Sequence, residues 1–336
     1  MSLSSLRSRR ISNYEALTVV TAVATLALIA VGALVRTTGS GLGCPDWPLC
    51  QGGLIPPAEK EAIIEYSHRT LAMVVGLLIM ATTWATLRVR FEDRPLRMLA
   101  IVALPLLLLQ AWLGKVTVDR ELPAEVVTVH LATALILLSV LAVVAAFAIQ
   151  GSARRRIESA ERASLLRLAA IAAVVTAVVL LVGSYLVGSD AGFACTQWPG
   201  CPEARVPFVD GGRLQHIHWL HRLTVVAGLA AVAVVGLAAA NLRTPAPALQ
   251  RAVWALLALY GAQIVIGALN IWTDFSDAAR VAHLAVGAAI WALLVTVVVA
   301  GRYEPAAHAV DEAEHTASSG EPAPASGPES VSGARA

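Results

Sequence analysis

Four of the eight histidines in this 336-residue chain lie inside long apolar segments, namely His68, His130, His221 and His283. An ionisable side chain is costly inside a membrane-spanning helix, so such residues usually serve function. Two imidazoles at the same depth on two helices of one bundle can supply both axial ligands of a haem iron. A helix-packing histidine bonded to a backbone carbonyl would explain one of these residues, but not four of them at matched positions.

The matched positions belong to an internal repeat. Features of the first half of the chain return 153 residues later, in the same order and in several separate segments. The pairs with this offset are His68-Arg69 and His221-Arg222, Gln110 and Gln263, Gly114 and Gly267, and His130 and His283. The repeat therefore predicts two similar pockets, one formed by His68 with His130 and the other by His221 with His283.

Zinc is the alternative metal for such histidines. A zinc site usually needs a third or fourth protein ligand close by. Neither half has an obvious Cys or Asp at the depth of its histidine pair. We therefore expect each pair to bind haem rather than zinc.

The four cysteines form two similar loops, CPDWPLC at 44–50 and CTQWPGC at 195–201, which lie 151 residues apart. If both loops face the oxidising side of the membrane, we expect disulfides between Cys44 and Cys50 and between Cys195 and Cys201. Two pairs of free thiols are the alternative. Closing so short a loop adds only modest stability, so a redox role stays open beside a structural one.

The composition predicts a polytopic membrane protein. The chain is 57% hydrophobic and 14% charged, whereas soluble domains carry about a quarter charged residues. The net charge of +2 does not suggest a nucleic-acid partner. Eight apolar runs are long enough to cross a bilayer. We expect helices over residues 16–35, 67–87, 96–116, 125–149, 165–187, 217–241, 250–271 and 279–300.

The repeat and the spans together predict the fold class. Each half holds four spans, and because four is an even number, both halves enter the membrane in the same direction. We therefore expect an all-α integral membrane protein. Its eight transmembrane helices would form two tandem four-helix bundles, related by a pseudo-two-fold axis along the membrane normal.

Arginine-rich segments set the expected orientation, because basic loops stay in the cytoplasm. Three segments on one side carry them: Arg7, Arg9 and Arg10; Arg88, Arg90, Arg94 and Arg97; and Arg154, Arg155, Arg156, Arg162 and Arg167. We therefore expect a multi-pass protein of the cell (plasma) membrane, with both termini cytoplasmic and both cysteine loops outside.

The chain then divides into five parts. They are a cytoplasmic N-terminal segment (1–15), an N-terminal four-helix half (16–149), a cytoplasmic linker (150–164), a C-terminal four-helix half (165–302) and a cytoplasmic tail (303–336). The tail is rich in Ala, Pro, Ser, Gly and Glu and is expected to be disordered.

The two halves differ beside their first histidine. Glu65 precedes His68 by three residues, whereas His218 precedes His221 by the same spacing. Three residues make nearly one helical turn, so Glu65 and His68 share a face. Glu65 is then either a group at the edge of the N-terminal pocket or a helix-start carboxylate stabilised by the helix dipole.

Arginines follow the first histidine of each pair. Arg69 and Arg222 could pair with haem propionates, or they could extend to the membrane interface. We favour the propionate interpretation.

These features together resemble haem A synthase. The resemblance rests on eight spans in two tandem halves, the E-x-x-H-R sequence at 65–69, paired histidines on the even-numbered spans and two Cys-x5-Cys loops. It covers about residues 16–302, and the combination is specific although each motif alone is weak. Members of that family oxidise the C8 methyl group of haem O to the formyl group of haem A, the cofactor of terminal oxidases.

The resemblance implies roles for individual residues. His221 and His283 would bind a resident haem b through its iron, and His68 and His130 would bind the substrate haem. Glu65 matches the functionally important carboxylate of the family. The cysteine pairs match those of its cysteine-bearing branch, whereas other members lack them. The implied partners are haem O, membrane lipid, haem O synthase, oxidase assembly factors and further copies of this chain, with an electron donor that is not identified.

The expected chemistry is that of a membrane haem-dependent oxidoreductase. Converting a methyl group to an aldehyde is a four-electron oxidation, in which two hydroxylations give a geminal diol that loses water. Amino-acid side chains do not hydroxylate a C–H bond unaided, so a metal cofactor must do so. A nearby carboxylate could move protons during these steps.

Three other functions compete with this interpretation. A bis-histidine di-haem b-type cytochrome that transfers electrons would use the same four histidines without needing Glu65. A thiol–disulfide oxidoreductase would typically carry Cys-x-x-Cys, which neither loop has. A transporter would place its polar residues at mid-membrane, whereas the conspicuous ones here lie near the outer surface.

Overall fold

The computed structural model describes residues 11–243 and 246–305, and these residues form eight long helices. The helices are α1 (Asn13–Thr37), α2 (Lys60–Val89), α3 (Arg94–Asp119), α4 (Ala124–Gln150), α5 (Ala160–Gly188), α6 (Arg213–Ala240), α7 (Pro247–Trp272) and α8 (Asp277–Ala300). All eight are long and apolar enough to cross a membrane. The structure therefore confirms an all-helical, multi-pass membrane protein with the expected eight spans.

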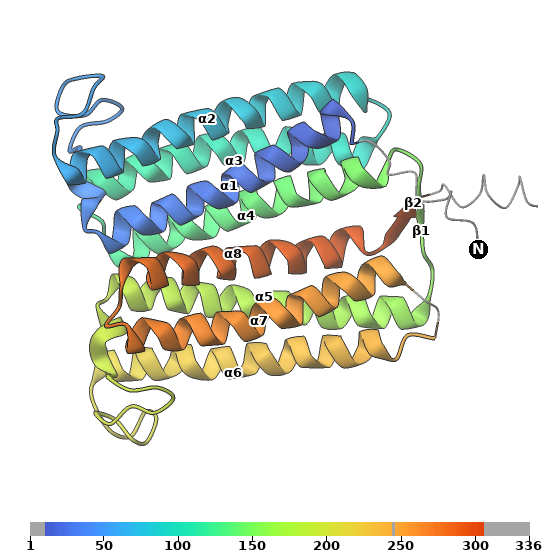
Figure 1. The fold of residues 1–336 in the computed structure, drawn as a ribbon. Helices are drawn as coiled ribbons and strands as arrows, with labels where there is room; N and C mark the ends of the chain where they lie inside the picture. Colours follow the sequence, from blue (N-terminus) through green and yellow to red (C-terminus); the bar gives the residue numbers. More distant parts are fainter. Residues whose placement is uncertain (1–10, 244–245, 306–336) are drawn as a thin grey trace, which may run out of the picture.

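Helices α1–α4 lie together on one side of the molecule and α5–α8 on the other (Figure 1). Helices α1 and α4 contact α8, and α4 also contacts α5, so these four helices join the two groups. The loops between α1 and α2 and between α5 and α6 project from the same end of the molecule (Figure 1). We call this end the loop end, and we call the opposite end, which carries the two short strands, the strand end.

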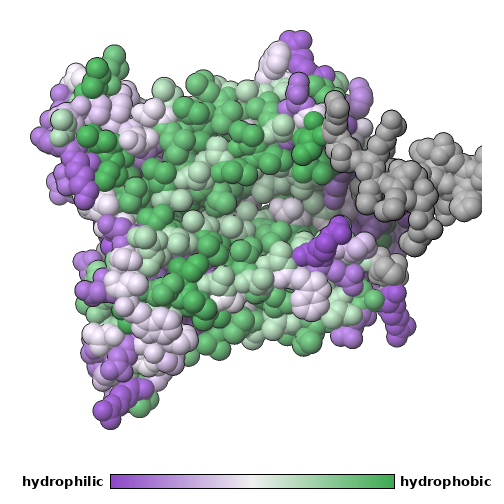
Figure 2. Space-filling view, viewed as in Figure 1, coloured by the Kyte–Doolittle hydropathy of each residue, from purple (hydrophilic) through white to green (hydrophobic). Residues whose placement is uncertain are grey.

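The surface has the polarity that a lipid bilayer requires. Figure 2 shows apolar side chains along the middle of the helices and hydrophilic ones gathered toward the two ends. Large apolar side chains such as Met73, Leu108 and Val226 are more than 60% exposed. Lipid tails would cover them, because apolar surface of this extent is rare on a soluble monomer.

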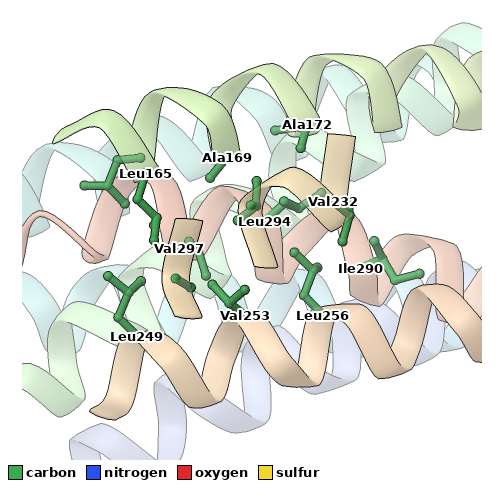
Figure 3. Packing of buried hydrophobic residues seen from close by; sticks show 14 of the residues in the cluster. Leu165, Ala169, Ala172, Val232, Leu249, Val253, Leu256, Ile290, Leu294 and Val297 are labelled. Carbon is green, nitrogen blue, oxygen red and sulfur yellow. The ribbon is translucent and has the colours of Figure 1, made fainter. Parts of the chain in front are cut away.

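Small and branched residues fill the interior of the C-terminal group. Leu165, Ala169 and Ala172 of α5 pack against side chains of the other three helices of this group. The close-up of this cluster shows Val232, Leu249, Val253, Leu256, Ile290, Leu294 and Val297 around them (Figure 3). The alanines let the helix backbones approach closely, as is usual for helices packed in membranes.

Several helices extend beyond the expected apolar spans. Helix α2 begins at Lys60 rather than near residue 67, and α5 begins at Ala160 rather than near 165, with Ser159 as its N-cap. Lys, Glu and Arg favour helix well enough to continue the helix outside the apolar stretch. Glu65 therefore lies in the second turn of α2 and not at its start.

The linker and the chain just after α8 form a short strand pair that was not predicted from the sequence. Arg154–Arg156 form strand β1, which pairs antiparallel with strand β2, Tyr303–Pro305. Arg162 of α5 donates to Glu304 and to the carbonyl of Gly301. The expectation of a disordered tail from residue 303 is therefore wrong for 303–305, because the linker holds these residues in place. Residues 306–336 lie outside the described residues.

Candidate functional site

Each of the four repeated histidines packs against a glycine of the preceding helix. A Cβ atom added to any of these glycines would lie 3.0–3.4 Å from the Cε1 atom of the histidine ring. The pairs are Gly32 with His68, Gly114 with His130, Gly183 with His221, and Gly267 with His283. The imidazoles thus lie against bare helix backbone, and a larger residue at any of these glycines would crowd the ring.

The two histidine rings of the C-terminal half lie close together. The ring centroids of His221 and His283 are 6.4 Å apart, with their planes at 75°. A bond from a metal to an imidazole nitrogen is about 2 Å long. Two such bonds, together with the distance from nitrogen to centroid in each ring, add up to the separation of the two centroids. The centroid separation is therefore that expected of two imidazoles bound to one metal atom.

Buried nitrogen atoms support a ligand at these positions. The Nδ1 atoms of His68, His221 and His283 are buried and have no hydrogen-bond partner among the described residues. Buried polar atoms without partners are few in native proteins and point to a missing ligand or water.

The glutamines of the repeat hold the second histidine of each pair. The side-chain amide of Gln110 lies 3.2 Å from Nε2 of His130 and donates to the carbonyl oxygen of the same residue. Gln263 donates to the carbonyl oxygen of His283 at 2.8 Å. The same contact thus fixes α3 to α4 in one half and α7 to α8 in the other.

The donor set fits haem better than zinc. Among the described residues, the one cluster of three possible metal ligands is Cys195, Cys201 and Glu203, and its two sulfur atoms are joined in a disulfide. Each histidine pair therefore offers two imidazoles without a third protein ligand. Two axial imidazoles suit a haem, whose porphyrin supplies the other four ligands.

Glu65 links the N-terminal histidine helix to the first cysteine loop. Glu65 as a whole residue is only 4% exposed. One carboxylate oxygen accepts a hydrogen bond from the backbone N–H of Cys44 at 2.8 Å, and the other accepts one from Arg69 at 2.5 Å. The carboxylate thus lies one turn from His68 and is directed toward the loop end.

His218 occupies the equivalent position in the C-terminal half. It is 6% exposed, and its Nδ1 atom lies 3.0 Å from the carbonyl oxygen of Ala191. Both side chains therefore tie the histidine helix to the segment that follows the preceding span. In the N-terminal half the contact is made by the carboxylate of Glu65, and in the C-terminal half by the imidazole of His218.

The two arginines bind the cysteine loops. Arg69 donates to the carbonyl oxygens of Cys44, Asp46 and Leu49, each at 2.6 Å. Arg222 donates in the same manner to the carbonyl oxygens of Gln197, Pro199 and Gly200. Both guanidinium groups therefore fix a loop above the adjacent histidine, and their contact with haem propionates remains a prediction.

The structure pairs Cys44 with Cys50 and Cys195 with Cys201, and all four residues are at most 3% exposed. The first loop is also stabilised by Asp46, whose carboxylate accepts hydrogen bonds from the backbone N–H groups of Gln51 and Gly52. The bond from Gly52, more than any other contact, holds the pKa of Asp46 below its usual range.

The first glycine of each pocket, Gly32 or Gly183, was not predicted from the sequence. Gly32 and Gly183 lie 151 residues apart, which is the offset of the cysteine loops. Extending the comparison of the two halves toward the N-terminus would have found them. A glycine inside an apolar span otherwise carries no signal, because small residues are common wherever membrane helices meet.

Known proteins match most of the chain. The model of the COX15-CtaA family, described as cytochrome oxidase assembly protein, matches residues 15–63 and 58–295. A haem A synthase of Symbiobacterium thermophilum is 34% identical over 261 residues, which are 74% of this chain and 82% of that protein. A haem A synthase of Bacillus licheniformis is 30% identical over 189 residues, 56% of this chain and 63% of that protein.

A relative with another name matches a similar share of the chain. A protohaem IX farnesyltransferase of Thermus thermophilus is 33% identical over 286 residues. The match covers 79% of this chain but only 44% of that protein, so more than half of that protein lies outside the match.

Proposed function

Because the chain belongs to the COX15-CtaA family of cytochrome oxidase assembly proteins, we propose that it is a haem A synthase. It would oxidise the C8 methyl group of haem O to the formyl group of haem A, for use in terminal oxidases. The similarity to haem A synthases supports this activity. One observation carries the proposal. The two halves have histidine pairs at equivalent positions, but only the N-terminal half has a buried acidic residue, Glu65, one turn before its first histidine.

We assign the C-terminal histidines to a resident haem b. His221 and His283, whose ring centroids lie 6.4 Å apart, would hold its iron. Gly183 and Gly267 leave the space beside the rings. A bound haem b would supply one-electron redox chemistry.

The N-terminal histidines would hold the substrate. His68 and His130 can orient haem O through its iron, while Gly32 and Gly114 leave the rings close to helix backbone. Glu65 lies one turn from His68 and is shielded from solvent, so it is placed to take up and release protons as the methyl group is oxidised. Its bond to Arg69 would hold the carboxylate in place.

The proposed topology follows from the repeat. The two groups of helices would be tandem four-helix bundles related by a pseudo-two-fold axis along the membrane normal. The loop end would face outward and the strand end the cytoplasm, so both termini would be cytoplasmic in the plasma membrane. The basic residues of the strand end, including Arg88, Arg94 and Arg155, support this orientation.

The proposed partners follow from the substrate. Haem O is poorly soluble in water, so direct transfer from the enzyme that makes it is expected. The similarity to a farnesyltransferase of Thermus thermophilus supports an association with haem O synthase. Oxidase assembly factors and further copies of this chain complete the proposed set.

The test is the haem content of the purified protein, measured by pyridine haemochrome spectra and mass analysis. A haem A synthase should yield haem b together with haem A, haem O or a partly oxidised haem O. Expression with and without a haem O source makes the assay specific for the conversion. Unmodified haem b in both pockets, with no haem A under either condition, would replace the proposal by a di-haem cytochrome.

A further inference from the structure

The two halves differ in the side chains that meet above their histidine pockets at the loop end. In the C-terminal half, Phe193 contacts Phe275 edge to face, with ring centroids 4.6 Å apart. Trp198 contacts Trp272 in the same manner at 5.7 Å. Both pairs connect the segment between α5 and α6 to the end of α7 and the turn before α8.

These aromatic pairs lie above the C-terminal pocket. Trp198 belongs to the disulfide loop that Arg222 holds, and Arg222 directly follows His221. Trp272 ends the helix whose Gly267 contacts His283. The two pairs therefore join the segment between α5 and α6 to the end of α7 and the turn before α8, at the loop end of the helices that carry His221 and His283.

The N-terminal half has the same backbone at these positions but no aromatic pair among its described residues. Leu122 and Phe275 are equivalent, and each has a positive φ, 61° and 58°. Each donates its N–H to the helix before it, at 2.8 Å and 2.6 Å. The equivalents of the other three rings are Leu42 for Phe193, Trp47 for Trp198 and Asp119 for Trp272. Only one ring of the four thus remains.

Two cavities lie where the rings are missing. A cavity of about 470 Å³ is lined by Leu42, Pro45, Val118, Asp119 and Glu121. A second cavity of about 450 Å³ lies between α3 and α4 and is lined by Asp119, Val126 and Val129 among others. Both volumes are within the range of small-molecule pockets, roughly 300–1,000 Å³.

We propose that the pairs Phe193–Phe275 and Trp198–Trp272 close the C-terminal pocket and retain its haem, whereas Leu42 and Asp119 leave the N-terminal pocket open for exchange of substrate and product. This inference rests on the proposed function, since it explains how one haem stays while another passes through. The aromatic pairs act as positioning residues that slow the departure of the haem without binding its iron. Asp119 keeps the N-terminal opening polar and is held by an ion pair with Lys115.

The first experiment measures how fast haem b leaves the purified full-length protein. Excess apomyoglobin takes up the released haem, and the absorbance change gives the dissociation rate. Replacing Trp272→Asp and Phe275→Leu gives the C-terminal half the residues of the N-terminal half. Loss of two aromatic contacts should raise the dissociation rate about tenfold. Phe193→Leu alone, at a side chain that is 56% exposed, should give a smaller increase and does not disturb the core.

Trp84→Leu is the matched control, because Trp84 is 62% exposed and lies near the strand end of α2. It should leave the dissociation rate unchanged. The reverse change, Asp119→Trp, should place a ring beside Trp47 and slow the uptake of added haem O by the N-terminal half. Asp119→Asn removes the charge without adding a ring, and should leave uptake close to the wild-type rate.

The outcomes separate this inference from the proposed function. Suppose that the wild type makes haem A, but that the double variant (Trp272→Asp with Phe275→Leu) and the single variant Phe193→Leu both release haem b at the wild-type rate. The closure proposal is then wrong and the enzyme assignment stands. If the swap accelerates release but no haem A forms in the wild type, the retaining role stands and the enzyme assignment fails. Equal slowing of haem O uptake by Asp119→Trp and Asp119→Asn would overturn the open-pocket half of the inference.

Discussion

The carboxylate of Glu65 accepts a hydrogen bond from the backbone N–H of Cys44 at 2.8 Å. This contact joins the helix of His68 to the first disulfide loop across 21 residues of sequence. The hydrogen bond therefore fixes the position of the loop relative to the helix. The acid, the loop and the histidine pocket form one connected unit at the loop end of the N-terminal half.

Replacing Glu65→Gln tests the acid itself. Gln is nearly the same size and can still accept from the Cys44 N–H, but it cannot carry a charge or exchange a proton. We expect the variant to fold, to keep haem b and to make haem A about 10²–10⁴ times more slowly. The ratio of haem A to haem O in cells, at matched protein levels, measures this. A wild-type ratio would remove Glu65 from the mechanism.

Removing an axial ligand tests the haem b assignment. His221→Ala or His283→Ala should abolish the low-spin haem b spectrum of the purified protein, because one of two iron ligands is lost. His216→Ala is the control, since His216 lies near the start of α6, where it contacts the backbone of Asp210. Full low-spin haem b and full turnover in His283→Ala would refute the assignment.

Adding one methyl group tests the close packing on the histidine ring. The Cβ of Gly183→Ala would lie 3.0 Å from Cε1 of His221, so the ring must move. Overpacking of this kind costs about 1–3 kcal/mol, and we expect weaker haem b binding with a shifted absorption band. Gly261→Ala is the matched control, because nothing lies within 4 Å of its added Cβ. Identical spectra and affinities for the two variants would contradict the expected role of Gly183.

The disulfides are tested by peptide mapping without reduction. We expect one peptide that links Cys44 to Cys50 and another that links Cys195 to Cys201, because each pair is local in sequence and in space. Cells grown under oxidising conditions should give both links in nearly every molecule. Cross-paired peptides, or four thiols that react with an alkylating agent before reduction, would show that the pairing is different.

The first loop should also depend on pH. Its Asp46 has a pKa held below the ordinary value of 3.8 in the folded protein, chiefly by the N–H of Gly52. A lowered pKa contributes stability that is present above the unfolded pKa and is lost as the pH falls through the folded value. Hydrogen exchange at Gln51 and Gly52 should therefore differ between the wild type and Asp46→Asn at pH 7, and the difference should disappear as the pH falls well below 3.8.

Glu203→Gln is the control for this loop, because Glu203 bonds Thr196 in the other half. It should leave exchange at Gln51 and Gly52 unchanged at every pH. An equal effect of the two substitutions on these amides would show that Asp46 does not stabilise the loop locally.

The spans could be predicted from the sequence because each rests on a local pattern, and the matched histidines because the two halves of the chain repeat. Apolar length marks each span, and the constant offset relates His68 to His221 and His130 to His283. The full helix lengths were missed, since a helix such as α2 continues through Lys60 and Glu61, beyond its apolar part. Periodicity of apolar residues carries no information about such ends.

The partners of the charged groups could not be predicted from the sequence. Glu65 and Arg69 bind backbone atoms of a loop some twenty residues away, and that loop has no regular pattern from which its path could be inferred. The strand β1 was also missed. Three consecutive arginines show no strand signal, and they pair only because the end of α8 brings residues 303–305 beside them.

The strand pair has a consequence for anything attached to this chain. Strand β2 ends at residue 305 on β1, and Arg154 beside it forms a buried ion pair with Asp93 of the loop between α2 and α3. The last described residues are thereby anchored between the two groups of helices (Figure 1). A fluorescent protein, affinity tag or second enzyme fused after residue 305 would therefore start between the two groups of helices. A truncation at Ala300 would leave Arg162 without its partner Glu304.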